Sequence, residues 1–103
     1  MNTYGLVLEA LADPTRRRVY EGLREGPRSV GDLASELPVS RPAVSQHLKV
    51  LKDSGLVREE RRGTRRFYEI EPRGLEALRM YLDGFWGDVL AAFAKAVDGK
   101  DDK

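Results

Sequence analysis

Hydrophobic residues in the first half of the chain recur three or four positions apart, which is the spacing of one helix face. Breaks at Asp13-Pro14, Gly26-Pro27 and Pro38-Val39 divide this half into segments, because a cap residue followed by proline starts a helix and glycine or proline ends one. The pattern predicts four helices, which run to about Ala12, from Pro14 to before Gly26, from about Val30 to Leu37 and from about Arg41 to Ser54.

The hydrophobic period changes from helical to alternating at Leu56. Residues 56–62 and 65–70 predict two strands joined by Gly63-Thr64, where glycine in the first loop position favours a type II′ turn. Such a two-residue loop sets the register, so that Arg58 faces Glu69, Glu60 faces Phe67, Glu59 faces Tyr68 and Val57 faces Ile70. The hairpin then has one half-buried face formed by Val57, Tyr68 and Ile70.

A long helix is predicted from Pro72 to about Val97, with a wide apolar face that ends in Phe93 and Val97. A helix of roughly 25 residues is longer than a small domain can cover, and aromatic anchors suit a self-complementary interface. The predicted dimer interface consists of Tyr4, Leu8, Leu78, Leu82, Phe85, Trp86, Val89 and Phe93. Two alternatives are a core helix within one chain and a small molecule bound near Trp86 or Tyr81.

The composition describes one small domain, with 103 residues, 41% hydrophobic content and a net charge of +1. We expect this domain over residues 1–97 and a polar tail over 98–103. The chain has no cysteine and one histidine, so no nucleophile and base can be paired and an enzyme is not expected. No leader and no apolar run of about 18 residues occurs, which predicts a cytoplasmic protein without a membrane partner.

Charge is concentrated in the middle of the chain. Residues 41–66 contain 8 basic and 3 acidic side chains, whereas residues 67–103 contain 5 basic and 8 acidic ones. A basic segment is typical of a surface that binds phosphates, and it is equally typical of a solvated charged face. Arg16, Arg17 and Arg18 lie in the first turn of a helix, where pairing with nearby carboxylates is favoured over phosphate contact.

The predicted helix over 41–54 has two distinct faces. Val44, His47, Leu48 and Leu51 fall on one side, and short polar side chains fall on the other. Short polar side chains near a helix N-terminus can enter the major groove of DNA. The candidate DNA-binding residues are Ser40, Arg41, Pro42, Ser45, Gln46 and Lys49, with Arg62 and Arg65 of the hairpin.

Within this set we expect Ser40, Arg41, Ser45 and Gln46 near bases and Lys49 on a phosphate. In the alternative reading Ser40 is only a helix cap and Gln46 is merely exposed. For the hairpin arginines, the alternative is pairing with Glu59 and Glu60.

Two short helices joined by a turn and followed by a basic hairpin follow the order of a winged helix-turn-helix. The chain resembles the ArsR-type repressors of bacteria and archaea over about residues 4 to 97. The motifs that carry the resemblance are Leu11-Ala12-Asp13-Pro14-Thr15-Arg16, Val30-Gly31-Asp32-Leu33-Ala34, Ser40 to Leu51, Gly55-Leu56-Val57 and Arg62 to Tyr68.

The resemblance implies a mainly α fold of about five helices with a small two-stranded antiparallel β-hairpin as wing, dimerising through the first and last helices. It implies a dimeric, nucleoid-associated repressor of double-stranded DNA that binds a pseudo-palindromic operator. Residues 41–54 would lie in the major groove and the hairpin over 56–70 would act as the wing. His47 would pack or face a phosphate.

The sequence departs from the metal-sensing members that it resembles. Those relatives have a cysteine pair on the helix that here spans Val30 to Leu37, or histidine and acidic ligands on the last helix, and this chain has neither. The run Leu82-Asp83-Gly84-Phe85-Trp86 resembles the metal-independent branch instead. We therefore expect no metal, no cofactor and an unknown effector. The alternative function is a winged-helix module that binds proteins rather than specific DNA.

Overall fold

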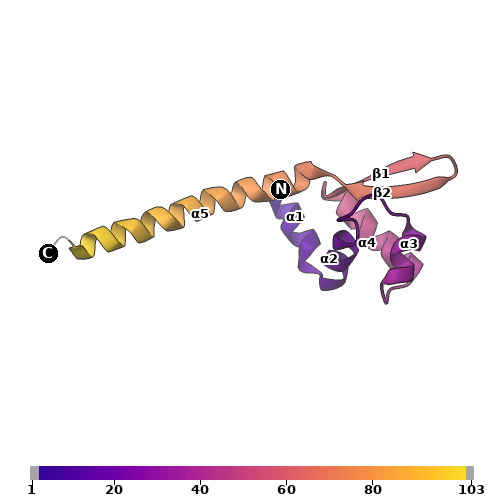
Figure 1. Cartoon of the computed structure of the whole chain (residues 1–103), viewed down its shortest axis with the longest axis horizontal. Coiled ribbons are helices and arrows are strands. Elements are labelled where there is room, and N and C mark those ends of the chain that lie inside the picture. The colour runs from indigo at the N-terminus through magenta and orange to yellow at the C-terminus, as the bar shows by residue number, and fades with distance from the viewer. Residues whose placement is uncertain (1–2, 102–103) are drawn as a thin grey trace.

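The computed structural model describes residues 3–101 and consists of helices with one antiparallel hairpin (Figure 1). The elements are α1 (Thr3–Ala12), α2 (Pro14–Glu21), α3 (Val30–Glu36), α4 (Arg41–Asp53), β1 (Val57–Arg62), β2 (Arg65–Ile70) and α5 (Pro72–Asp101). α1 and α5 are in contact. The predicted mainly helical winged fold is confirmed.

Side-chain caps start three of the helices where the sequence predicts. Asp13 Oδ1 accepts a hydrogen bond from the backbone N–H of Arg16 at 3.0 Å, and Ser40 Oγ accepts one from that of Ala43 at 3.3 Å. Ser29 and Asp32 form a reciprocal capping box at the start of α3. α2 ends at Glu21, and tighter turns continue the chain to Gly26.

The hairpin has the predicted register, from Val57 opposite Ile70 to Arg62 opposite Arg65. Gly63 has a φ of +65° and Thr64 does not adopt a positive φ, as a type II′ turn requires. β1 starts at Val57 because the N–H of Leu56 closes the end of α4 by bonding to the Leu51 carbonyl at 2.9 Å. The predicted strand start at 56 is therefore one residue early.

The core lies where the first four helices meet the base of the hairpin. Its members are the buried residues Val7, Ala10, Val19, Tyr20, Leu23, Leu33, Val44, Leu48, Leu51, Leu56 and Val57. Backbone hydrogen bonds in both directions between Arg28 and Tyr68, at 2.9 and 2.8 Å, tie β2 to the segment that precedes α3. The hairpin is thereby held against the helices.

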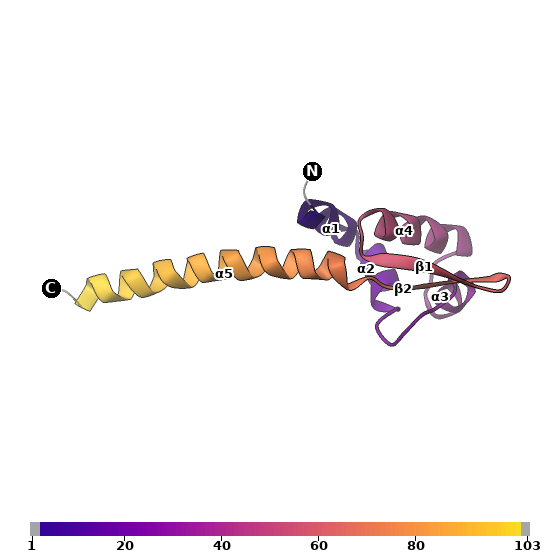
Figure 2. The same ribbon diagram turned by 90° about the horizontal axis from the view of Figure 1, so that it is seen from above.

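α5 projects far beyond the helical body (Figures 1 and 2). The radius of gyration is 18.7 Å, whereas a compact domain of this length has about 13 Å. The helix continues to Asp101, past the predicted end at Val97, because residues 98–101 contain no proline to stop its hydrogen bonding. The part of the predicted tail at 102–103 lies outside the described residues. Within residues 3–101, no helix combines the length and apolar character of a membrane span.

Candidate nucleic-acid interface

α4 has a buried face and a polar outer face, as the sequence predicts. Val44, Leu48 and Leu51 are buried against the core, and His47 is half-buried. The outer face is exposed and consists of Arg41, Pro42, Ser45, Gln46 and Lys49. α4 packs on both α2 and α3, so the outer face is held on a rigid support.

The polar side chains on this face differ in what they already bind. Ser40 is engaged as the N-cap of α4, although it remains exposed. Ser45 and Gln46 have no side-chain partner among the described residues, so their hydrogen-bonding groups face solvent. Lys49 Nζ lies 3.1 Å from Asp53 Oδ2, and both side chains are mostly exposed, at 77% and 64%. Such exposed pairs contribute little, so Lys49 stays available to a stronger anion.

The four arginines nearest to Gly63 are exposed, and their contacts divide them into two pairs. Arg62 lies 3.2 Å from Glu60 and Arg66 lies 3.3 Å from Glu59, as the alternative reading expects. Arg61 and Arg65 have no ion pair within the described part of the chain. The guanidinium of Arg65 lies over the Phe67 ring at 5.0 Å, and that of Arg62 lies over it at 5.1 Å.

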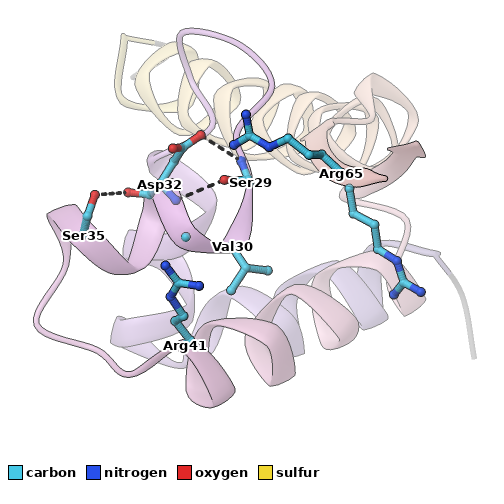
Figure 3. A pocket seen from close by; sticks show the side chains of 8 residues that line it. Ser29, Val30, Asp32, Ser35, Arg41 and Arg65 are labelled. Carbon is cyan, nitrogen blue, oxygen red and sulfur yellow. Dashed lines mark hydrogen bonds between the residues drawn. The ribbon is translucent and has the colours of Figure 1, made fainter. Parts of the chain in front are cut away.

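A groove of about 510 Å³ lies where α3, the hairpin and the start of α4 meet. Its lining residues are Ser29, Val30, Gly31, Asp32, Ser35, Arg41, Arg65 and Arg66. Figure 3 shows Arg41 extending from α4 toward the start of α3. A Cβ atom at Gly31 would lie 3.2 Å from Nη2 of Arg41, so glycine leaves room for the guanidinium. The groove brings together the predicted residues Arg41 and Arg65.

One carboxylate lies in this groove beside the three guanidinium groups. Asp32 Oδ2 accepts a hydrogen bond from the backbone N–H of Ser29 at 3.2 Å, as the dashed lines in Figure 3 show. The hydrogen bonds from Ser29 lower the pKa of Asp32, so its carboxylate stays charged and tied to α3. Sequence reasoning did not place the lining residues of α3 and its cap in the binding site, because the approach of α3 to β2 is a tertiary contact; these residues are Ser29, Val30, Gly31, Asp32 and Ser35.

The arginines at the start of α2 do not join this groove. Arg16 is mostly buried, donates to the Ala10 carbonyl at 3.1 Å and lies 3.9 Å from Asp13. The predicted pairing with a nearby carboxylate is therefore confirmed for Arg16. For Arg17 and Arg18 this prediction is wrong, because both are exposed and have no ion pair among the described residues.

The residues predicted for a dimer interface lie on α1 and α5. Tyr4 stacks on Tyr81, with ring centroids 4.2 Å apart, and Leu78 packs at the edge of the core. The other predicted residues are exposed, including Phe85 at 56%, Trp86 at 61% and Phe93 at 66%. An uncovered apolar face of this kind is typical of an interaction surface.

Among the described residues, no cluster of three or more histidine, cysteine, aspartate or glutamate side chains could hold a metal ion. The candidate site is a surface of guanidinium, amide and hydroxyl groups. These groups can bind phosphates and base edges.

Comparisons with known proteins agree with this geometry. Residues 11–60 match a family described as a helix-turn-helix domain. The chain is 55% identical over 94 residues to the HTH-type transcriptional regulator Rv2034 of Mycobacterium tuberculosis, covering 91% of this chain and 88% of that protein.

Two solved structures show the same fold. An ArsR-like transcriptional regulator from Rhodococcus sp. RHA1 is 31% identical with a TM-score of 0.76, covering 91% of this chain and 92% of the other. A homodimeric winged helix-turn-helix DNA-binding domain from Mycobacterium bovis, described as a possible ArsR-family regulator, is 30% identical with a TM-score of 0.66, covering 87% and 79%. This chain belongs to the ArsR family of winged helix-turn-helix transcriptional regulators, which is a family of regulators and not of enzymes.

Proposed function

We propose that this protein is a homodimeric repressor that binds a pseudo-palindromic operator in double-stranded DNA. α4 enters the major groove and the hairpin acts as the wing against the neighbouring backbone. One observation carries the proposal: α4, whose Ser45 and Gln46 side chains have no partner among the described residues, and the hairpin, which bears exposed arginines, lie at the same end of the molecule (Figure 2).

The proposed division of labour follows from the contacts of each side chain. Ser45 and Gln46 are exposed and unpartnered among the described residues, so their groups can pair with base edges without breaking an internal bond. Ser40 and Pro42 lie at the start of α4, beside Ser45 and Gln46, and contact the DNA at the edge of this surface. Lys49, Arg62 and Arg65 bind phosphates, which contributes affinity for every sequence.

Two residues in or beside this surface are assigned more narrowly. Arg41 lies in the groove between α3 and the hairpin. This position favours contact with the DNA backbone over the contact with a base that the sequence suggested. His47 is half-buried and packs beneath the outer face, so we assign it no ligand role.

The dimer is proposed to form through α1 and α5. The exposed apolar residues Leu8, Leu82, Phe85, Trp86, Val89 and Phe93, together with Tyr4 and Leu78 at the α1 contact, supply its surface. A twofold dimer presents two copies of α4, which matches an operator with two half-sites. The M. bovis structure described above is homodimeric.

Regulation is proposed to be independent of metal ions. The chain has no cysteine and one histidine, so a site with three or four nitrogen and sulfur ligands cannot be built from one copy. Two copies would still lack thiolates, because the chain has no cysteine, and they would supply only two histidines. A zinc titration followed by DNA binding tests this directly: an unchanged affinity is expected, and a zinc-dependent release would disprove metal independence.

The central experiment is a fluorescence anisotropy titration on the DNA upstream of the protein's own gene, with random-sequence DNA as competitor, at two salt concentrations. Preferential and salt-sensitive binding with two chains per site is expected. Equal and weak binding to both DNAs, with retained binding to a protein partner, would favour the interaction-module alternative.

A further inference from the structure

Glu59 is an acidic residue in the middle of the basic hairpin, and it bridges two elements. Its Oε1 lies 3.0 Å from Lys52 Nζ of α4, and its Oε2 lies 3.3 Å from Arg66 Nε of β2. Both carboxylate oxygens are therefore used, one for each element. Only 20% of the Glu59 side chain is exposed, whereas that of Glu60 is 47% exposed.

The register of the hairpin explains why Glu59 reaches α4. Glu59 lies opposite Tyr68, on the same face as Val57, and Val57 is buried in the core. This is the face that packs toward the helices, and β1 is in direct contact with α4. The hydrogen bond from Lys52 lowers the pKa of Glu59, so the bridging carboxylate remains charged at neutral pH.

A carboxylate so close to a DNA-binding surface carries an electrostatic cost. Glu59 repels phosphates and occupies two cations, Lys52 and Arg66, that could otherwise bind them. A residue that only served affinity would be neutral or basic here. The double bridge instead joins α4 to β2 through the Glu59 carboxylate.

We propose that Glu59 is a positioning residue for DNA recognition: it locks the wing to α4 so that both contact the operator in one register. This inference rests on the proposed DNA-binding function. The lock reduces affinity for arbitrary DNA and raises the preference for the operator. A wing held in one place makes all its contacts only with DNA of matching geometry.

Glu59→Gln is the direct test, since glutamine has the same shape without the charge. Affinity for random DNA is expected to rise, because a negative charge is removed and two cations are released. The ratio of operator to random-DNA affinity is expected to fall by about fivefold, as for loss of one specific contact. An unchanged ratio would overturn the proposal.

Glu60→Gln is the matched control, because Glu60 is the next residue and, within the described residues, pairs only with Arg62 of the same strand. It removes the same charge and frees one cation without touching α4. Random-DNA affinity should therefore rise, with less than about a twofold change in the ratio. An equal fall of the ratio in both variants would show that charge alone sets it, and would overturn the positioning role.

Lys52→Gln provides a second break of the same bridge from the side of α4. The ratio of operator to random-DNA affinity is expected to fall as in Glu59→Gln. The affinity for random DNA is not expected to rise, because Lys52→Gln removes a cation. The double variant should lose no more of the ratio than either single variant, since the bridge is broken only once. Additive losses would show that the two residues act separately.

A measurement without DNA separates this inference from the proposed function. The NMR order parameter of the Gly63 amide is expected to fall from about 0.85 toward about 0.6 in Glu59→Gln and to stay unchanged in Glu60→Gln. A rigid wing in both variants would overturn the lock. If the wild-type protein shows no DNA preference, the proposed function fails, and this measurement alone still decides whether Glu59 holds the wing.

Discussion

Among the described residues, some short polar side chains cap helices and others have no partner on the surface. Asp13, Ser29 and Ser40 each satisfy a backbone N–H at a helix start, which is why the helices begin where they do. Ser45 and Gln46 make no such contact within the described residues. The residue type alone does not separate these roles, whereas the hydrogen-bond partner does.

Gln46→Ala tests whether an unpartnered side chain reads bases. The preference for the operator over random DNA is expected to fall by about tenfold. A bidentate amide contact discriminates between bases by about 1–3 kcal/mol, and tenfold lies within this range. Lys49→Ala should instead weaken binding to both DNAs equally and reduce the salt slope by about one. Competition titrations at two salt concentrations measure both effects. A uniform loss for Gln46→Ala would contradict base reading.

Tyr20 is a buried residue whose hydroxyl has no hydrogen-bond partner among the described residues. Tyr20→Phe is expected to raise the free energy of unfolding by about 1 kcal/mol, because an unsatisfied buried group is removed. Urea denaturation at neutral pH measures this change. A loss of stability in the variant would show that the hydroxyl does make a favourable contact.

The same residue predicts an alkaline dependence of stability. Burial raises the pKa of Tyr20 from 10.0 to about 12. Between these pH values the Tyr20 hydroxyl therefore ionises in the unfolded chain and stays neutral in the folded one. The ionisation of Tyr20 leaves the free energy of unfolding unchanged below pH 10 and lowers it by about 1.4 kcal/mol per pH unit as pH rises toward 12. Urea denaturation at alkaline pH should show a shallower loss for Tyr20→Phe, and equal losses would exclude Tyr20 as the source.

Among the helices and strands, the junction between α4, the hairpin and α5 depends on close backbone contact. Gly55 ends α4 with a φ of +85°, a conformation that glycine adopts without strain. Gly74, in the first turn of α5, is buried against it, and a Cβ atom there would lie 2.6 Å from the Gly55 carbonyl oxygen. This contact sets the direction in which α5 leaves the domain.

Gly74→Ala is expected to destabilise the protein by about 1–3 kcal/mol, because the added methyl group meets backbone that cannot move aside. Gly84→Ala is the matched control in the same helix, since its Cβ would have no neighbour within 4 Å. It should stabilise the protein by about 0.5–1 kcal/mol through the helix propensity of alanine. Chemical denaturation of both variants measures the difference, and equal effects would refute the close contact.

The molecule as a unit consists of a compact winged domain and an extended helix with little of its own to pack on. The extents of 70 × 26 × 24 Å express this shape. Beyond the stacking of Tyr4 on Tyr81 and the packing of Leu78 against the core, the large apolar residues of α5 are exposed. Exposed aromatic residues in such a row are costly in water unless a second surface covers them.

Phe85→Asp and Trp86→Ala are expected to convert a dimer into monomers, because buried aromatic anchors dominate such interfaces. Met80→Ala is the control, because Met80 is even more exposed than Phe85 and Trp86, at 66%, but lies off the apolar face of α5. Sedimentation velocity over a range of concentrations distinguishes the two states. An unchanged dimer in both test variants would place the interface elsewhere. Variants that become monomeric should also lose affinity for the operator.

Local sequence alone determined the start of α2, α3 and α4, the register of the hairpin and the polar face of α4. Each depends on interactions between residues near in sequence: a cap and the N–H three positions on, a two-residue turn, or a face repeated every helical turn. The end of α5 was predicted less well, because polar residues after Val97 are compatible with both a helix and a coil.

Tertiary structure alone decided what lies between these elements. The groove that brings Arg41 to Arg65, the bridge from Lys52 through Glu59 to Arg66, and the close contact of Gly74 with Gly55 all join separate segments. Side-chain type and spacing predict that Glu59 can pair with a nearby arginine. Which cations it holds depends on how the hairpin packs against α4, and that packing is set by the shared core.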